Sequence, residues 1–172
     1  RAGSPGGGSA AGRAGGESAA GRAGGESAAG CGAVVAERSA ANAVLRGGAE
    51  LVARRLTGLE AQPISSVGVG FGTEAADPGA TALTPPPDPA IPAAALSSAV
   101  RPEDVTVKPG GQDEIVVSLA TVFHPTVELA DVTEAGLFGG SRLYNQVVFE
   151  PVTLRPGQDV TFFWEIDFPY GH

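Results

Sequence analysis

The clearest pattern of hydrophobic and polar positions lies near the end of the chain, at residues 160–168. Apolar and polar side chains alternate there with a period of two, as in a half-buried β-strand. One face carries the apolar residues Val160, Phe162, Trp164, Ile166 and Phe168, and the other carries Thr161, Glu165 and Asp167. Phe163 interrupts the polar face, so we expect that face to be partly covered. Buried large side chains contribute about 1.5–3 kcal/mol each, which predicts that this strand lies at the centre of the core.

Two segments of similar sequence each predict a β-hairpin. Residues 105–115 read Val-Thr-Val-Lys-Pro-Gly-Gly-Gln-Asp-Glu-Ile, and residues 152–162 read Val-Thr-Leu-Arg-Pro-Gly-Gln-Asp-Val-Thr-Phe. Pro presets φ at the first turn position and Gly accepts a positive φ at the next, as a type II turn requires. The strands expected after these turns are residues 114–123 and 160–168.

Shorter strands are expected between the two hairpins, at residues 127–132, 135–138 and 142–149. Pro125 and Pro151 should lie at strand ends or sheet edges, because proline has no N–H to donate to a neighbouring strand. Short strands with frequent turns are typical of an antiparallel β-sandwich, of jelly-roll or Ig-like type. We predict this mainly β fold for residues 60–172.

A helical pattern precedes the strands, at residues 34–59. Its apolar stripe consists of Leu45, Val52, Leu56 and Leu59. A stripe at these spacings indicates an amphipathic helix, which we expect to pack on the chain's own sheet, with a neighbouring subunit as the alternative. Gly47 and Gly48 indicate a bend or close packing, and Gly58 is a candidate C-cap.

A glycine-rich strand and a proline-rich connector link the helix to the hairpins. Residues 65–72 read Ser-Ser-Val-Gly-Val-Gly-Phe-Gly, with apolar side chains on one face and glycines that permit close backbone approach on the other. The run lacks the Lys-Ser/Thr ending of a phosphate-binding loop. The connector at residues 73–102 favours polyproline geometry. We interpret it as a covering loop with a short helical turn at residues 93–99, the alternative being a ligand for aromatic grooves.

Residues 1–33 are a low-complexity arm. The nine-residue unit Gly-Arg-Ala-Gly-Gly-Glu-Ser-Ala-Ala at residues 12–20 recurs unchanged at residues 21–29, after a degraded copy at residues 3–11. Gly, Ala and Ser bury too little apolar surface to offset about 1–2 kcal/mol of backbone ordering per residue. We therefore expect an extended N-terminal arm that neighbouring chains hold in place, with a flexible linker as the alternative.

Charge and composition exclude several function classes. The formal net charge of −8 resides after the arm, because residues 1–33 are slightly basic. An acidic body argues against binding to nucleic acid or to an anionic membrane.

The chain has one cysteine, Cys31, so it forms no intrachain disulfide, and we interpret Cys31 as an incidental thiol. The sequence contains no Met, which predicts that Arg1 is not the translation start.

Candidate chemistry is sparse. His124 and His172 have no zinc-binding spacing, and no Gly-x-Ser-x-Gly elbow accompanies them. Glu165 and Asp167 share one strand face and could serve as a glycosidase pair or as Ca²⁺ ligands. Solvated outer-face carboxylates are the simpler interpretation. We predict no catalytic residue, no metal ligand and no cofactor.

Several segments between residues 42 and 168 carry a family resemblance. They are residues 42–56, 67–73, 81–83, 132–138, 143–149, 151–152 and 160–168. The most specific is Thr-Glu-Ala-Gly-Leu-Phe at residues 133–138, followed by the aromatic strand. Together they resemble a family of small virion proteins of tailed bacteriophages and prophages, described as tail-fibre-like or structural. The arm and the connector are not part of that family's pattern.

The resemblance implies a structural protein without catalytic residues. Gly136 is expected where the backbone turns or approaches another closely, with Leu137 and Phe138 anchoring that turn in the core. The predicted core and anchor residues are Gly136, Leu137, Phe138, Phe149, Phe162, Trp164 and Ile166.

We therefore expect a non-enzymatic structural protein of a tailed-phage or phage-like virion, assembled in the host cytoplasm. It would decorate the capsid or tail, or attach a fibre or collar. Its expected partners are other virion proteins and copies of itself, not nucleic acid or membrane, with a host-surface glycan as a further partner. One alternative is a secreted sandwich that binds carbohydrate or a host surface. Tyr144, Phe163, Trp164 and Tyr170 could form a sugar platform, although the register of Trp164 with the apolar face of its strand favours a core position. The other alternative is a hydrolase that uses an acid pair.

Overall fold

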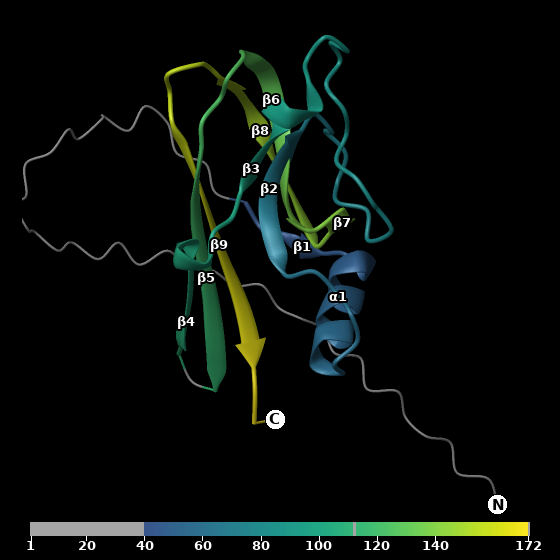
Figure 1. Ribbon diagram of the computed structural model, residues 1–172, viewed down its shortest axis with the longest axis vertical. Coiled ribbons are helices and arrows are strands. Elements are labelled where there is room, and N and C mark those ends of the chain that lie inside the picture. The colour runs from purple at the N-terminus through teal and green to yellow at the C-terminus, as the bar shows by residue number, and fades with distance from the viewer. Residues whose placement is uncertain (1–39, 112, 172) are drawn as a thin grey trace, which may run out of the picture. The chain divides into compact units, whose positions relative to one another are not determined.

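The computed structural model describes residues 40–111 and 113–171, which belong to one compact unit, Arg38–His172 (Figure 1). Strands dominate these residues, arranged in two antiparallel sheets with one α-helix. The protein is therefore mainly β, as the alternating pattern predicted. The arm predicted at residues 1–33, together with Cys31 and His172, lies outside the described residues.

The larger sheet is centred on a long strand, β6. Its strand order is β1-β8-β6-β2-β3, with β7 also paired to β6. The strands are β1 (Ala43–Val44), β2 (Ile64–Gly70), β3 (Ser97–Ala99), β6 (Leu129–Gly139), β7 (Arg142–Leu143) and β8 (Asn145–Leu154). β6 contains the strand expected at residues 135–138 and residues 129–132 of the strand expected at 127–132. The register with β8 shifts between Leu129 and Val132, where Asp131 has a φ of 56°, and again between Val132 and Glu134, where the break was expected, so β6 continues through an irregularity at that point.

The smaller sheet contains three strands in the order β4-β5-β9. They are β4 (Val105–Pro109), β5 (Glu114–Phe123) and β9 (Val160–Pro169). The first predicted hairpin is confirmed, since β4 pairs antiparallel with β5. The second is wrong, because β8 pairs with β6 whereas β9 pairs with β5. The turn between β8 and β9 therefore carries the chain from one sheet to the other.

The two turns also differ from each other, despite their similar sequences. After β8, Gly157 has a φ of 80° and the Gln158 N–H donates to the Arg155 carbonyl at 3.1 Å, as the predicted type II turn requires. In the β4–β5 hairpin the positive φ, 57°, belongs to Asp113 and not to Gly110. The type II turn predicted at Pro109-Gly110 is therefore wrong.

Apolar side chains from both sheets pack together in a sandwich-like arrangement. One cluster comprises Val67, Leu119, Ala135, Leu137, Tyr144 and Trp164. A second comprises Val69, Phe123, Leu129, Val132 and Leu154. The Phe162 ring joins them, because it stacks on Trp164 at 5.6 Å and meets Phe123 edge-on at 6.0 Å. The core therefore lies between the sheets.

The alternation predicted for β9 is confirmed, but its position in the fold is not. Trp164 is 4% exposed, whereas Phe163 on the opposite face is 61% exposed. That second face is therefore uncovered, contrary to expectation. β9 lies at the edge of the smaller sheet, and the fully buried residues gather along β6 instead. Phe168, expected on the core face, is 41% exposed near the end of the strand.

Within the described residues the helix is shorter than predicted and buries a different face, and residues 34–39 of the prediction lie outside them. α1 (Arg46–Leu56) begins only at Arg46, because Ala43 and Val44 pair with β8. Leu45, Gly48 and Leu51 are buried, whereas the expected stripe residues Val52, Leu56 and Leu59 are exposed. The helix packs on its own sheet through Gly48, where a Cβ would collide with the Tyr144 carbonyl. Close packing, one of the two predicted roles of this glycine pair, is therefore confirmed.

The helix ends next to Gly58, as expected from the sequence. Thr57 is the C-cap, and Gly58 follows it with a φ of 74°. The Leu59 N–H donates to the Arg54 carbonyl at 2.9 Å and the Gly58 N–H to the Arg55 carbonyl at 3.3 Å. This is the Schellman arrangement, in which two carbonyls at the helix end gain partners.

The connector covers the outer face of the larger sheet. β2 buries Val67 and Val69 toward the core, and its glycines leave room on the other face. A Cβ at Gly70 would lie 2.8 Å from the Cβ of Leu83, a connector residue. The short helical turn is confirmed as a 3-10 helix at Ala93–Leu96, followed by β3, which sequence patterns did not predict. A second 3-10 helix, Pro102–Asp104, precedes β4.

The two prolines lie where a missing N–H is tolerated. Pro125 follows the end of β5, as predicted. Pro151 lies inside β8, at a point where the register with β6 shifts between Val132 and Glu134. A bulge therefore takes the place of the strand end that was expected there.

Replacing Trp164 with alanine should lower the free energy of unfolding by about 3–5 kcal/mol, because it leaves a cavity between the sheets. The matched variant Phe163→Ala removes an exposed ring of the same strand and should change it by at most about 0.5 kcal/mol. Chemical denaturation of the two variants measures the difference. Equal losses would contradict the assignment of the two faces.

Gly48→Ala should destabilise the protein by about 1–3 kcal/mol, because the added methyl group meets the Tyr144 backbone. Helix propensity alone predicts the opposite, a gain of about 1 kcal/mol. Ala53→Gly, on the exposed side of α1, is the control for propensity and should cost about 1 kcal/mol. Thermal denaturation that shows a stabilised Gly48→Ala protein would refute the close packing.

Candidate functional site

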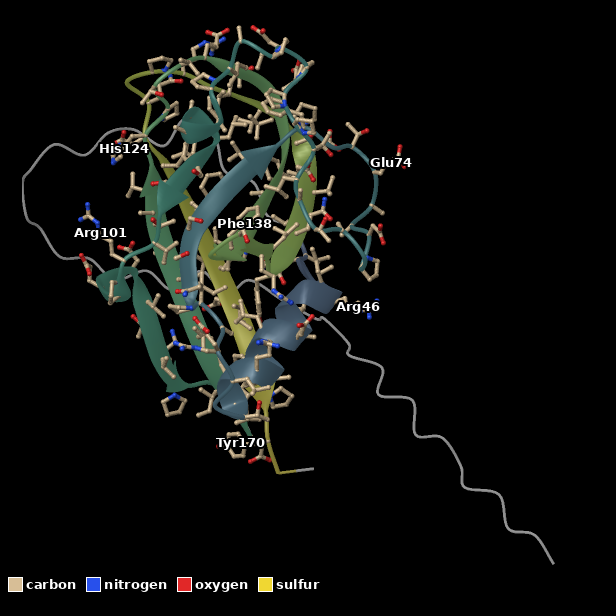
Figure 2. The ribbon with its side chains drawn as sticks, turned by 45° about the vertical axis from the view of Figure 1, so that its right-hand side comes forward. Arg46, Glu74, Arg101, His124, Phe138 and Tyr170 are labelled. Atoms are coloured by element: carbon tan, nitrogen blue, oxygen red, sulfur yellow. The ribbon has the colours of Figure 1, made fainter. Side chains whose placement is uncertain are left out.

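The Thr-Glu-Ala-Gly-Leu-Phe motif forms the middle of β6, and the turn predicted there is wrong. Its glycine does lie at a close approach, because a Cβ at Gly136 would be 2.5 Å from the Asn145 carbonyl oxygen. Leu137 is fully buried in the core between the sheets. Phe138 (labelled in Figure 2) is half-buried on the other face, with its ring against Gly68. The motif anchors the sheet on both faces.

The remaining predicted anchors pack in the core. Trp164 is a member of the first cluster, and Ile166 is half-buried against it. Phe149 and Phe162 are half-buried and pack against both clusters. These four side chains come from β8 and β9, so they join the two sheets.

The motif also contains a buried carboxylate that sequence patterns did not single out. Glu134 is 0% exposed. Its Oε1 accepts hydrogen bonds from the Gly72 N–H at 3.0 Å and the Thr84 N–H at 2.5 Å, and its Oε2 accepts one from Gln146 Nε2 at 2.5 Å. Glu134 thus ties both ends of the loop at residues 72–84 to β6. Strand register gives a hint of this, since Glu134 pairs with Gly70, which has no side chain to obstruct the carboxylate.

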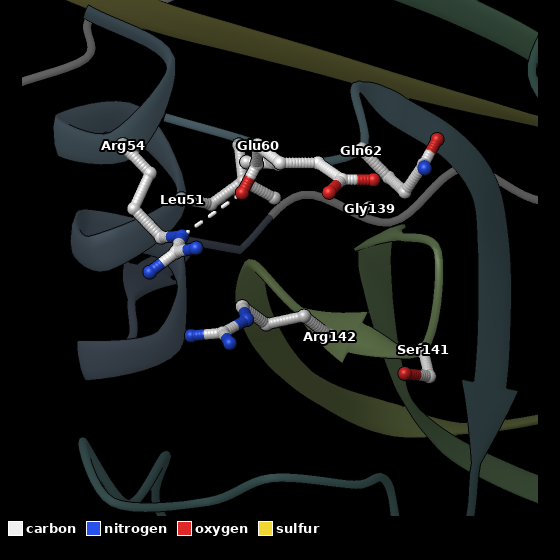
Figure 3. A pocket seen from close by; sticks show the side chains of 8 residues that line it. Leu51, Arg54, Glu60, Gln62, Gly139, Ser141 and Arg142 are labelled. Atoms are coloured by element: carbon white, nitrogen blue, oxygen red, sulfur yellow. Dashed lines mark hydrogen bonds between the residues drawn. The ribbon is translucent and has the colours of Figure 1, made fainter. Parts of the chain in front are cut away.

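Two shallow hollows are the best-defined concavities among the described residues. One, of about 220 Å³, lies between α1 and the β6–β7 turn (Figure 3) and is lined in part by Arg54 and Arg142. Both guanidinium groups have partners, because Arg142 pairs with Glu50 at 2.7 Å and Arg54 Nε donates to the Glu60 carbonyl at 3.0 Å. Ligand pockets commonly measure about 300–1,000 Å³. This hollow is therefore a poor small-molecule site.

The second hollow, of about 470 Å³, lies beside the bulge of β8. It is lined by Ala40, Thr73, Thr133, Val148, Phe149, Glu150 and Pro151. Among the described residues that line it, Glu150 is the only ionisable one, so they do not offer the converging titratable side chains expected of a catalytic site.

The candidate catalytic side chains lie on open surface. Glu165 and Asp167 are exposed on the outer face of β9, and neither lines either hollow. His124 Nδ1 lies 2.6 Å from Asp159 Oδ1, with both side chains more than half exposed. Within residues 40–111 and 113–171, no three His, Cys, Asp or Glu side chains are grouped to hold a metal ion.

The four aromatic residues considered for a sugar platform do not meet. Tyr144 and Trp164 are each 4% exposed, and burial raises the pKa of the Tyr144 hydroxyl. Phe163 and Tyr170 are exposed, but at about 3.3 Å per residue their positions along the chain lie roughly 20 Å apart. The proposed platform, in which these aromatic rings would stack on one sugar ring, is therefore wrong, and the core position expected for Trp164 is confirmed.

Unpaired strand edges are the more prominent surface feature of the described residues. The larger sheet ends in β1 and β3, which are only two and three residues long. Residues 147–154 of β8 extend beyond the pairing with β1, but a bulge and Pro151 interrupt that stretch. In the smaller sheet, β4 ends in Lys108 and Pro109, two residue types that discourage pairing with another strand. β9 differs, because it extends over ten residues, contains no lysine, and has its only proline at its last position. Figure 1 shows it beside β5, on the side opposite β4.

Exposed aromatic side chains accompany this edge. Phe163 and Phe168 belong to β9 and Tyr170 is the residue after it, and they are 41–61% exposed. We call these three residues and the open edge of β9 the docking surface. Exposed apolar groups next to unpaired backbone are typical of protein–protein contact sites.

Glu134→Ala should reduce the free energy of unfolding by about 3 kcal/mol, since it leaves the Gly72 and Thr84 amides without an acceptor. Glu128→Ala removes an exposed carboxylate paired with Arg155 at 3.2 Å and should cost at most about 1 kcal/mol. Hydrogen exchange measures the local effect, which is faster exchange of the Thr84 amide in Glu134→Ala alone. Unchanged protection there would contradict the role of Glu134 as a loop tie.

Comparisons with known proteins give no family for this chain. None of the described helices is long and apolar enough to cross a membrane. A scan against protein-family models, a search of curated proteins and a search of solved structures each find no match.

Proposed function

We propose that the chain is a non-enzymatic structural protein of a tailed-phage or phage-like virion. It would decorate the capsid or tail, or attach a fibre or collar, through a β-sandwich of jelly-roll or Ig-like type. Its partners would be other virion proteins and copies of itself. The observation that carries this proposal is the docking surface, where unpaired backbone of β9 lies beside exposed apolar side chains.

The rest of the described chain is consistent with a rigid building block. Glu134 fixes the loop at residues 72–84, and the sheets share a continuous apolar core. A repetitive shell needs parts that present the same surface in every copy, which such internal ties provide. The resemblance of the Thr-Glu-Ala-Gly-Leu-Phe element and the aromatic strand to small virion proteins supports the same proposal. The arm at residues 1–33 would thread across neighbours and lock them together.

Other function classes have weaker support. A hydrolase would need its carboxylates about 5–10 Å apart in a cleft, whereas Glu165 and Asp167 lie on an open strand face. A glycan-binding module would need grouped aromatic rings, whereas Tyr144 and Trp164 are buried.

Mass spectrometry of purified particles from the source cell should detect the chain in many copies. Deleting residues 1–33 should leave the sandwich folded, as judged by circular dichroism, and reduce the number of copies per particle. Glu128→Ala, a surface change outside the arm and the docking surface, should be incorporated normally. Absence of the chain from particles would refute the proposed function, and full occupancy by the truncated chain would refute the role of the arm.

A further inference from the structure

The open edge of β9 has a sequence that can pair with itself. Residues of one strand alternate between the core face and the outer face, so a second strand extends the sheet correctly only when core-facing residues lie opposite core-facing residues. When a two-fold axis relates two antiparallel copies of β9, the axis passes either through one residue and its copy or between two residues. Core-facing residues lie opposite core-facing residues only in the first case, in which the register is centred on a single residue. Three centres overlap most of the strand: Phe163, Trp164 and Glu165.

Charge and proline decide among these registers. Centring on Glu165 places that carboxylate opposite its own copy, and like charges directly opposite are destabilising. It also places Pro169, which has no backbone N–H to donate, opposite Thr161. Centring on Phe163 leaves the end of the strand, including exposed Phe168, without a partner residue in the other β9.

Centring on Trp164 removes these conflicts. Residues 160–168 of each copy then pair along their whole length, Glu165 lies opposite Phe163, and Asp167 lies opposite Thr161. On the core face, Val160 lies opposite Phe168, so the exposed ring of Phe168 gains an apolar neighbour. No carboxylate faces another across this pair of strands.

We propose that two copies of this chain associate through antiparallel pairing of their β9 edges, centred on Trp164. This inference rests on the proposed function, because it identifies one of the contacts between copies. β9 suits a partner strand because it is rich in Val, Thr, Ile, Phe and Trp, residues that favour strands. The arm at residues 1–33 is a weaker candidate for this edge, because its composition of Gly, Ala and Ser has low strand propensity.

A charge swap tests both the pairing and its register. In the full-length chain, Phe163→Asp places a new carboxylate opposite Glu165 of the other copy, twice in each dimer because of the symmetry. Sedimentation velocity should show weaker association, with a dissociation constant at least about tenfold larger than that of the parent chain. The double variant Phe163→Asp/Glu165→Lys places opposite charges at both positions and should restore association. Val44→Asp, an apolar-to-acid change at another exposed position on edge strand β1, should leave the dissociation constant unchanged.

Cysteine cross-linking provides a second measurement that does not depend on affinity. In a Cys31→Ala background, a mixture of Phe163→Cys chains and Glu165→Cys chains should form a disulfide between copies more readily than either variant alone. Cross-linking of Phe163→Cys alone would indicate the register centred on that residue, and cross-linking of Glu165→Cys alone the third register. Either result would overturn the register proposed here.

The possible outcomes separate this inference from the proposed function. A parent chain that stays monomeric at high concentration, with no cross-link in the mixture, overturns the pairing of β9. The same holds for a dimer that Phe163→Asp leaves intact. In both cases the chain can still be found in particles, so the proposed function is judged by the particle composition alone. Weakening by Phe163→Asp together with recovery in the double variant supports the proposal.

Discussion

The contact between the two sheets is the interaction on which the rest of the fold depends. β9 has a strand partner on one side only, so hydrogen bonds to β5 and burial of its core face hold it in place. Trp164 is the most buried side chain of that face, packed with Leu119 of β5 and with residues of the larger sheet. Because one face and one edge of β9 suffice to hold it, its other edge and Phe163 remain available to a partner.

The other face of the larger sheet is organised by residues that lack side chains. Glycines of β2 and Gly136 of β6 leave space that Leu83, Phe138 and Glu134 occupy. A buried carboxylate is unfavourable unless hydrogen-bonded, and Glu134 has three donors, two of them backbone N–H groups at the ends of the loop at residues 72–84. A loop of irregular backbone is thereby held in one position, which gives the protein a fixed shape on the side away from the docking surface.

Sequence patterns predicted those parts of the fold that depend on local order. The period-two alternation of β9, the valines of β2 and the helix end at Gly58 follow from residues close together in the chain. Pairing between distant strands does not. The repeated Pro-Gly segments have nearly the same sequence, yet one closes a hairpin and the other crosses between sheets, because β9 pairs with β5. Glu134 was missed for the same reason, since its donors lie at residues distant in sequence.

Hydrogen exchange of the full-length chain at low and high protein concentration tests the central claim, that β9 is the edge through which copies join. The account predicts that the amides of Val160–Phe168 that point away from β5 become more protected as the concentration rises, whereas those of β4, the opposite edge of the same sheet, do not change. Exchange in β9 that is independent of concentration, or protection gained at β4 instead, would contradict it.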